Sequence, residues 1–411
     1  MQFTRFLLRL KQFTRAYNTV KIQNNVGDAN LITKQLYNRI KATGPITLAD
    51  YMKEVLVNPL GGFYMHKDVF GSGGDFITSP ELNQMFGEMI AVWCINEWSK
   101  TGCPKPFQIV ELGPGRGSLM QDVLRVFKHF QSLDSCSLSL VEVSPYLSNI
   151  QAGALCTQFN DINNNSSSYY KEGKSVDGVP VRWYRSIEDV PEIFSIVIAH
   201  EFFDALPIHK FLKTENGYRE ILIDIGEKEG CFRYIIARND TPASRTFIKQ
   251  SETRNHLEVC PDGLVIVQTL ASRLESFGGL ALIADYGHLG EGTDTFRAFK
   301  KHKLHDPLVQ PGTADLTADV DFANLKQVAL EGDKVLAFGP VLQRDFLMKM
   351  GIEHRFKSLE KNASKTQLEA LKFGYEMMLD EKQMGKRFKF LSLLPAVLKK
   401  ILDKYPVAGF S

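Results

Sequence analysis

The chain has 411 residues, with 44% hydrophobic and 23% charged residues and a formal net charge of +2 at pH 7, which are ordinary globular values. Five of its cations lie in residues 1–21, which carry no acid, so the rest is mildly acidic and gives no electrostatic reason to expect nucleic-acid binding. No apolar stretch approaches the about 18 residues that cross a bilayer, so we expect no stable membrane insertion.

The N-terminal segment 1–21 is basic and amphipathic. A helix here would carry five apolar side chains on one stripe: Phe3, Phe6, Leu7, Leu10 and Phe13. A basic, hydroxylated and acid-free amphipathic segment is typical of a mitochondrial transit peptide, which we predict for residues 1–25. A surface helix or a membrane-surface anchor would give a similar pattern.

Residues 31–100 are predicted to form an N-terminal helical region that contains one long loop. Residues 31–57 have helical character, with a turn at Gly44 and an N-cap at Thr47. Residues 58–80 are rich in glycine and aromatic side chains, which favours a structured, ligand-facing loop over a disordered linker. Residues 81–98 are predicted to be a helix that packs on the core.

From residue 107 onward, predicted strands alternate with helices, which is typical of a parallel α/β sheet. The five predicted strands are 107–111, 137–143, 179–185, 195–199 and 280–286. We therefore predict a Rossmann-like core over residues 105–411, with a β-rich insertion at about 208–262 after the fourth strand. Residues 290–322 are expected to be a long polar loop, and residues 334–338 to close the sheet edge.

The run ELGPGRG, residues 111–117, follows the first strand and precedes a helix. A glycine-rich turn at this place lets a ligand approach backbone N–H groups at the helix N-terminus. The spacing acid-x-G-x-G-x-G of Glu111, Gly113, Gly115 and Gly117 is typical of S-adenosylmethionine (SAM) methyltransferases. A dinucleotide-binding fingerprint, G-x-G-x-x-G/A, would have glycine or alanine at residue 118, where this chain has Ser118, and Gly117 comes one residue too early for it. The acid can reach the ammonium group of SAM, a group that NAD lacks.

Acidic residues follow two other strands of the predicted sheet. Glu142 closes the second strand, where an acid accepts hydrogen bonds from ribose hydroxyls. Glu201 and Asp204 follow the fourth strand in HEFFDALP, so they are expected beside the reacting methyl group. Two carboxylates suit a guanidinium, which they bind in bidentate fashion. A helix cap or a structural salt bridge would use the same acids, and His200 is more simply a structural histidine than a base.

The remaining polar features of the sequence do not by themselves predict a catalytic, binding or metal site. Asp285–His288, DYGH, ends the fifth strand and either lines a pocket or turns the chain. Residues 300–305 are basic, as a solvated face commonly is. The six cysteines form no CxxC pair and no zinc-like spacing with histidine, so we expect reduced thiols and no metal site.

Six stretches together resemble the MidA-type methyltransferases, and in particular their mitochondrial arginine-methylating branch. They are GPITLADYMKEVLVNPLGGFY, GDFITSPELNQMFGE, VELGPGRGSL, HEFFDALPIHKF, ADYGH and PGTADLTADVDF. The resemblance implies SAM as cofactor and symmetric dimethylation of an arginine on a core matrix-arm subunit of respiratory complex I, in the mitochondrial matrix. It also implies that residues 74–81 cover the cofactor, with Gly74, Thr78 and Ser79 binding it. Bacterial relatives tend to carry Asn at the place of His200, where Asn often contacts the substrate nitrogen.

These observations predict a SAM-dependent protein arginine methyltransferase with Glu201 and Asp204 as catalytic acids. The alternative is a non-catalytic assembly chaperone for complex I that keeps the fold. Retention of Glu111, the glycines and Glu142 argues against this alternative, because a degenerate fold has no need of them. An NAD-linked oxidoreductase is disfavoured by Ser118.

Overall fold

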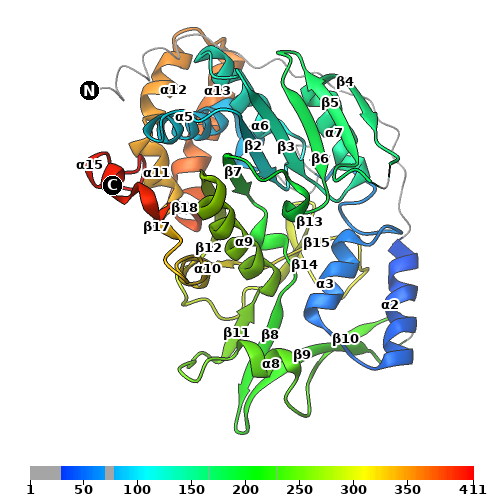
Figure 1. Ribbon diagram of the computed structural model, residues 1–411. Helices are drawn as coiled ribbons and strands as arrows, with labels where there is room; N and C mark the ends of the chain where they lie inside the picture. Colours follow the sequence, from blue (N-terminus) through cyan, green and yellow to red (C-terminus); the bar gives the residue numbers. More distant parts are fainter. Residues whose placement is uncertain (1–28, 70–77, 165, 229) are drawn as a thin grey trace.

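The structure is a computed structural model that describes residues 29–69, 78–164, 166–228 and 230–411. The predicted transit peptide 1–25 and Gly74 lie outside the described residues. Figure 1 shows a broad sheet with helices in the upper part of the molecule and a smaller lobe of strands and helices below it. No helix in the described part of the chain has the length and apolar character that crossing a bilayer requires.

A large mixed sheet forms the upper part, which confirms the predicted α/β fold with a Rossmann-like sheet. Its strands, in spatial order, are β17 (Val335–Leu342), β18 (Phe388–Pro395), β12 (Gly279–His288), β7 (Ser195–His200), β2 (Phe107–Leu112), β3 (Cys136–Val141), β6 (Pro180–Tyr184), β5 (Lys171–Ser175) and β4 (Cys156–Asp161). The five from β12 to β6 run parallel, and short β16 (Val320–Asp321) adds to the end of β12. The order reverses at β2, which pairs with β3 on one side and β7 on the other, so a crevice opens beyond its carboxyl end.

The strands are apolar on both faces because helices cover both faces. Phe107 and Ile109 of β2 join one core cluster, whereas Val110 and Leu112 join another, as the twofold alternation of a strand requires. The first face is covered by α5 (Gln84–Lys100), α6 (Ser118–His129) and α7 (Pro145–Leu155). The second is covered by α9 (Pro261–Phe277) and α10 (Phe322–Ala329).

The lower lobe joins the predicted insertion to the N-terminal helices. Its sheet contains β11 (His256–Val259), β8 (His209–Thr214), β9 (Gly217–Ile225), β10 (Phe232–Ile236) and the short β1 (Ile46–Thr47). The helices of this lobe are α2 (Ala29–Thr43), α3 (Leu48–Val57) and α8 (Pro242–Phe247). The Thr47 side chain accepts a hydrogen bond of 3.0 Å from the Asp50 N–H, which confirms it as the N-cap of α3. The helices and the insertion therefore share one core, in which Tyr51 and Ile223 are fully buried.

Two sequence expectations were wrong in detail. The predicted helix 81–98 is interrupted, because α4 (Ser79–Leu82) ends at an extended Asn83 whose side chain caps α5. The segment 290–322 is not a plain loop. It folds into a small sheet of β14 (Lys303–His305), β13 (Arg297–Lys300) and β15 (Asp315–Thr317). Strands this short owe their formation to pairing with each other, so a periodicity search has too few residues to detect them.

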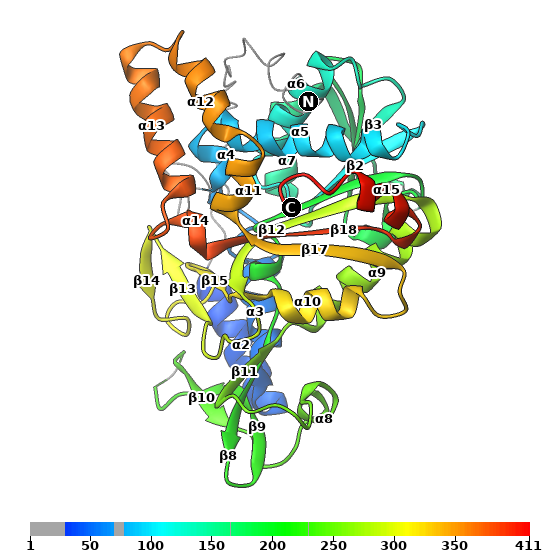
Figure 2. The same ribbon diagram turned by 90° about the vertical axis from the view of Figure 1, so that its left-hand side faces the viewer.

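The C-terminal part completes the sheet and adds a helical layer. The predicted edge strand 334–338 is present as β17, but β18 lies between it and β12 and was not predicted. The helices are α11 (Gln343–Lys349), α12 (Ile352–Glu360), α13 (Lys365–Leu379), α14 (Met384–Arg387) and α15 (Lys399–Lys404). Figure 2 shows α14 directly above the β13–β14 hairpin, so residues distant in sequence meet beside the end of β12.

Candidate active site

A cavity of about 850 Å³ lies beyond the carboxyl ends of β2, β3, β7 and β12. Its walls come from the glycine turn after β2, the turn after β7, the β13–β15 sheet, α3 and the segment around α14. Figure 1 shows that this region lies between the large sheet and the lower lobe. The position is the one that strand topology assigns to ligands in open α/β sheets.

The glycine turn has the conformation that its sequence requires. Gly113, Gly115 and Gly117 have φ of 64°, 53° and 82°, in the left-handed region that favours glycine. Gly113 and Gly115 line the cavity, and a Cβ on Gly113 would lie 2.8 Å from a ring carbon of Phe202. Gly117 is the N-cap of α6 and packs near Leu155 instead of on the cavity wall. Two of the three glycines thus present backbone to the cavity, and the third begins the helix.

Glu111 and Glu142 are buried acids at the ends of the adjacent strands β2 and β3. Burial raises the pKa of Glu111 to about 8, with a further contribution from Glu142, and its Oε2 atom is buried without a hydrogen-bond partner among the described residues. Burial likewise raises the pKa of Glu142 to about 7, although it accepts hydrogen bonds from the Ser144 N–H at 2.8 Å and the Gln151 amide at 2.9 Å. The Oε2 atom of Glu111 is buried without a hydrogen-bond donor in the described part of the chain, next to a turn of glycines that carry no side chain. A cationic ammonium group, such as the one on the predicted SAM, would supply the missing donor.

The turn after β7 brings Glu201 and Asp204 to one cavity wall, as predicted for strand-end acids. Glu201 has φ of 49°, and the short 3₁₀ turn Phe203–Ala205 follows it. The fully buried Asp285 fixes this backbone, because its Oδ2 atom accepts from the N–H groups of Phe202, Phe203 and Asp204 at 3.1, 3.0 and 3.4 Å. Asp285 of DYGH therefore shapes the turn instead of lining the cavity.

Glu201 is a buried acid, and one of its two carboxylate oxygens accepts no hydrogen bond from the described residues. Burial raises its pKa well above the usual range, and the charge of Asp204 adds to this, whereas a backbone hydrogen bond from Ser79 opposes it. Its Oε1 atom is buried and has no hydrogen-bond partner among the described residues. The Nε2 atom of His200 lies 3.4 Å away, but burial lowers the pKa of that histidine to about 3, so it is neutral. His200 packs on the Phe86 ring at 4.8 Å, which agrees with a structural role.

Only one of the two carboxylate oxygens of Asp204 accepts hydrogen bonds from the described residues. Its Oδ2 atom accepts hydrogen bonds from the hydroxyls of Tyr286 and Thr317, the latter at 2.8 Å. Its Oδ1 atom is buried without a partner among the described residues. Burial raises the pKa of Asp204, and the hydroxyls and the charge of Arg297 oppose that rise. Tyr286 and Thr317 thus orient the carboxylate and leave one oxygen free for a ligand.

Asp315 is a third acid of this wall that the sequence did not single out. It lines the cavity, is 5% exposed, and accepts a hydrogen bond of 2.6 Å from the Tyr64 hydroxyl. Its charge contributes to the raised pKa of Glu201. Asp315 lies in β15, within the segment 290–322 that was expected to be a loop, so only the strand pairing brings it here.

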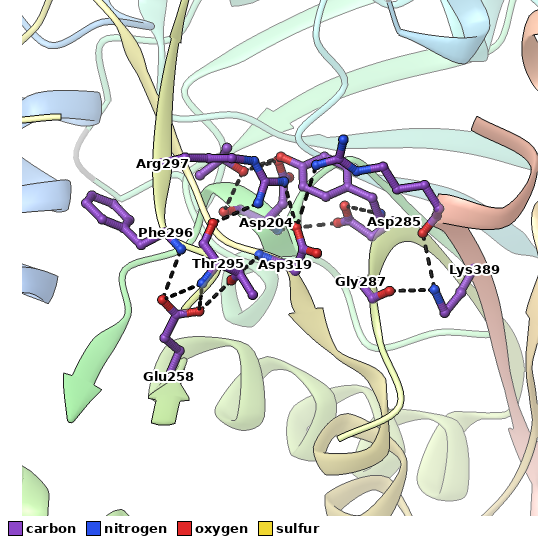
Figure 3. Close-up of polar contacts among 12 residues, drawn as sticks. Asp204, Glu258, Asp285, Gly287, Thr295, Phe296, Arg297, Asp319 and Lys389 are labelled. Atoms are coloured by element: carbon purple, nitrogen blue, oxygen red, sulfur yellow. Dashed lines mark hydrogen bonds and ion pairs between the residues drawn. The ribbon is translucent and has the colours of Figure 1, made fainter. Parts of the chain in front are cut away.

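Figure 3 shows how the lower lobe holds this wall in place. Glu258 of β11 accepts hydrogen bonds from the backbone N–H groups of Thr295 at 3.0 Å and Phe296 at 2.9 Å, and from the Thr295 hydroxyl. That hydroxyl accepts from the Asp319 N–H at 2.9 Å, and Arg297 pairs with the Asp319 carboxylate at 2.6 Å. The network fixes Arg297, which lines the cavity beside Asp204.

The predicted cofactor-covering segment is described only from Thr78 onward. Thr78 lines the cavity, and the buried Ser79 points its N–H toward the Glu201 carboxylate. Glu81 accepts a hydrogen bond from the Ser118 hydroxyl, which ties the segment to the start of α6. A cofactor role for Gly74, Thr78 and Ser79 stays a prediction. Among the described residues, no cluster of His, Cys, Asp or Glu is arranged to hold a metal ion.

Comparisons with known proteins identify the family of this chain. The sequence profile of a family described as "S-adenosyl-L-methionine-dependent methyltransferase" matches residues 89–341. The mitochondrial protein arginine methyltransferase NDUFAF7 of Xenopus tropicalis is 52% identical over 390 residues, which cover 93% of this chain and 90% of that protein. Its Homo sapiens counterpart is 50% identical over 368 residues, covering 88% and 83%.

A solved structure shares the fold. A crystal structure from Burkholderia thailandensis, bound to S-adenosyl-homocysteine, superposes with a TM-score of 0.75 and covers 92% of this chain and 96% of its own. The two sequences are 22% identical, so the likeness concerns the fold alone.

Proposed function

This chain belongs to the family of S-adenosyl-L-methionine-dependent methyltransferases, and we propose from that premise that its methyl acceptor is an arginine side chain of a protein. One observation carries the proposal. Glu201 and Asp204 line one cavity, and their buried atoms Oε1 and Oδ1, respectively, have no hydrogen-bond partner among the described residues. Two such acceptors match a planar cation with several N–H donors, and a guanidinium is that cation.

The cofactor side of the cavity is assigned to the turn after β2. The backbone of Gly113 and Gly115 would face the cofactor, Glu142 would accept from its ribose hydroxyls and Glu111 would face its ammonium group. When bound, SAM supplies an electrophilic methyl group on a sulfonium. The chain's own contribution is to hold the acceptor nitrogen in line with that group.

The acid pair also acts on the acceptor itself. Carboxylates at Glu201 and Asp204 would draw positive charge toward the nitrogens that they bind, which leaves the remaining nitrogen richer in electrons. A raised pKa equips Glu201 to accept the proton that the guanidinium loses on methylation. Asp285 holds both acids in place through the backbone of their turn.

The finer assignments rest on the family resemblance described above. We include in the proposal symmetric dimethylation of a core matrix-arm subunit of complex I, and action in the mitochondrial matrix. Support comes from similarity to proteins that are named as mitochondrial protein arginine methyltransferases.

The test is transfer of labelled methyl from SAM to purified matrix-arm core subunits of complex I, with the modified residue mapped by mass spectrometry. We expect label on arginine, and loss of label with Glu201→Gln. Binding of a subunit without any transfer would favour the chaperone alternative, and transfer to lysine or glutamine would contradict the guanidinium assignment.

A further inference from the structure

The paired strands β13 and β15 present one face to the cavity and bury the other. Their register places Arg297 opposite Thr317, and the next pair is Ala298 with Leu316. Ala298 and Leu316 are 0% and 1% exposed and belong to the core of the lower lobe. Because side chains alternate along a strand, Arg297 and Thr317 point the opposite way, toward Asp204 and the cavity that Arg297 lines.

Several contacts hold Arg297 in one place on this wall. Its guanidinium donates a hydrogen bond of 2.7 Å to the Thr295 carbonyl and pairs with the Asp319 carboxylate at 2.6 Å (Figure 3). The same group lies over two aromatic rings, 5.3 Å from the centroid of Tyr286 and 5.7 Å from that of Phe299. Its side chain is 17% exposed. A planar guanidinium can use its donors and its face at the same time, which an ammonium group cannot.

Two neighbours of Arg297 are the residues that orient Asp204. The ring of Tyr286 lies against the guanidinium, and Thr317 faces Arg297 across the strand pair. The hydroxyls of both residues donate to Oδ2 of Asp204. Oδ1 of the same carboxylate is left buried without a partner among the described residues. The place of Arg297 therefore bears on which oxygen of Asp204 can meet a ligand.

Arg297 also brings positive charge to an acidic wall. Acids and phenols reach that wall from the turn after β7, from β12, from β15 and from the segment after α3, and they are Glu201, Asp285, Tyr286, Asp315 and Tyr64. Arg387 lies over the Tyr286 ring as well, at 5.3 Å, but its side chain is 51% exposed. Burial raises the pKa of Asp204, whereas the hydroxyls of Tyr286 and Thr317 and then the charge of Arg297 oppose that rise. Loss of this cation would leave Asp204 protonated up to a higher pH.

We propose that Arg297 is a positioning residue for the methyl acceptor. It fixes Tyr286 and Thr317, and through them it keeps Oδ1 of Asp204 available to the incoming guanidinium. The inference rests on the proposed function, because it takes Asp204 as a ligand of that guanidinium. Arg297 is assigned no contact with the reacting atoms, so its loss should affect acceptor binding strongly and SAM binding little.

Binding of the acceptor is the first test. The probe is a fluorescent serine-rich peptide with one central arginine, and its anisotropy is followed with the full chain and S-adenosyl-homocysteine present. Arg297→Met should weaken binding by about tenfold or more, and Arg297→Lys by less, because lysine keeps the charge but not the planar group. SAM affinity should stay close to that of the wild type in both. Arg219→Met is the matched control, since Arg219 of β9 has a side chain 20% exposed, pairs with Asp240 and is not among the described residues that line the cavity.

Methyl transfer gives a second readout in the same variants. With the matrix-arm core subunits as acceptor, the loss in Arg297→Met should appear mainly in KM. Ionised Asp204 is needed to bind the acceptor, so kcat/KM falls as the pH drops through its pKa. Removal of Arg297 raises that pKa, and the acid limb of the profile should therefore move to higher pH in Arg297→Met but not in Arg297→Lys.

A double-mutant cycle shows whether Arg297 acts through Asp204. In a protein that already carries Asp204→Asn, Arg297→Met should have almost no further effect on peptide affinity, because the carboxylate that Arg297 positions has lost its charge. Melting curves check that all variants fold, and if Arg297→Met does not, Arg297→Lys takes its place in the cycle. Additive losses, or wild-type affinity in either folded Arg297 variant, would overturn the inference.

Failure of the proposed function has a different signature. A wild-type protein that binds the arginine peptide no better than a peptide with alanine in its place would contradict the guanidinium assignment, and the inference would fall with it. A wild type that prefers the arginine peptide, with the same preference in Arg297→Met, would leave the proposed function intact and overturn only the role of Arg297.

Discussion

The Oδ2 atom of Asp285 accepts a hydrogen bond of 3.0 Å from the backbone N–H of Phe203. With the two neighbouring bonds, it joins the end of β12 to the turn that carries both catalytic candidates. A buried acid that collects several N–H groups is costly to remove, since each donor left behind is unsatisfied.

Two replacements of Asp285 show whether its hydrogen bonds or its charge stabilise the fold. Asp285→Ala is expected to lower the free energy of unfolding by about 3 kcal/mol or more, because it removes the acceptor of four backbone N–H groups, those of Phe202, Phe203, Asp204 and Tyr286. Asp285→Asn keeps an acceptor, and burial with nearby acids already raises the pKa of Asp285 well above its usual range, so the loss should be less than half as large. Denaturant unfolding of both variants measures this, and equal losses would contradict the hydrogen-bond account.

Glu201→Gln keeps the size of the side chain and removes its charge. Methyl transfer is expected to fall roughly a hundredfold, about 3 kcal/mol, while SAM affinity stays nearly unchanged because other strands hold the cofactor. Asp204→Asn should cost the same or less. Radiolabel transfer and calorimetry measure the two effects, with Glu215→Gln, on an exposed hairpin turn, as the matched control. Wild-type rates in both cavity variants would make these carboxylates structural.

The cofactor-free protein should lose stability as pH rises from about 5 to about 8. Glu111 and Glu142 have folded-state pKa values of about 8 and about 7, above the 4.5 of an ordinary glutamate. The folded state therefore binds more protons than the unfolded state in this range, and the free energy of unfolding falls by up to about 1.4 kcal/mol per pH unit for each such group. Unfolding curves across pH test this, and Glu111→Gln should flatten the slope. A slope of opposite sign would show that these acids are ionised in the fold.

Gly115→Val is expected to abolish SAM binding without unfolding the protein. Its φ of 53° strains a branched residue, and the side chain would project where the cofactor must approach the backbone. Gly102→Val is the matched control, because φ there is 86° and a Cβ would meet nothing within 4 Å. Calorimetry should show weaker binding by at least about a hundredfold for the first and normal binding for the second. Normal binding by both would remove the glycine turn from the cofactor site.

Deletion of residues 1–21 removes the five cations of the amphipathic segment. A tagged, truncated protein is expected to stay in the cytosol, since the predicted import signal is removed. Imaging compares it with the full chain and with a version that keeps the segment but replaces its cations by glutamine. Matrix import of the truncated form would show that targeting lies elsewhere.

The sequence was sufficient where local pattern determines structure. The five parallel strands are apolar runs bounded by turns, and strand ends determine which acids meet, so Glu201 and Asp204 were predicted to share a cavity. Asp315 was missed, and Asp285 was noted at the end of its strand but not as the acceptor that fixes the turn after β7, because both roles arise from contacts across long sequence distances. β18 was missed for the same reason, since its place between β12 and β17 depends on two partners and not on its own periodicity.

The pairing of β1 with β9, Ile46 opposite Ile223, has a consequence for biosynthesis. The apolar face of α3, with Tyr51, Met52 and Val55, packs in a core that the later insertion completes. While the chain is being made, this face has no cover until the insertion has emerged from the ribosome. The lower lobe is therefore a late-folding unit of high contact order, and in the interval its first helices are expected to be clients of holding chaperones.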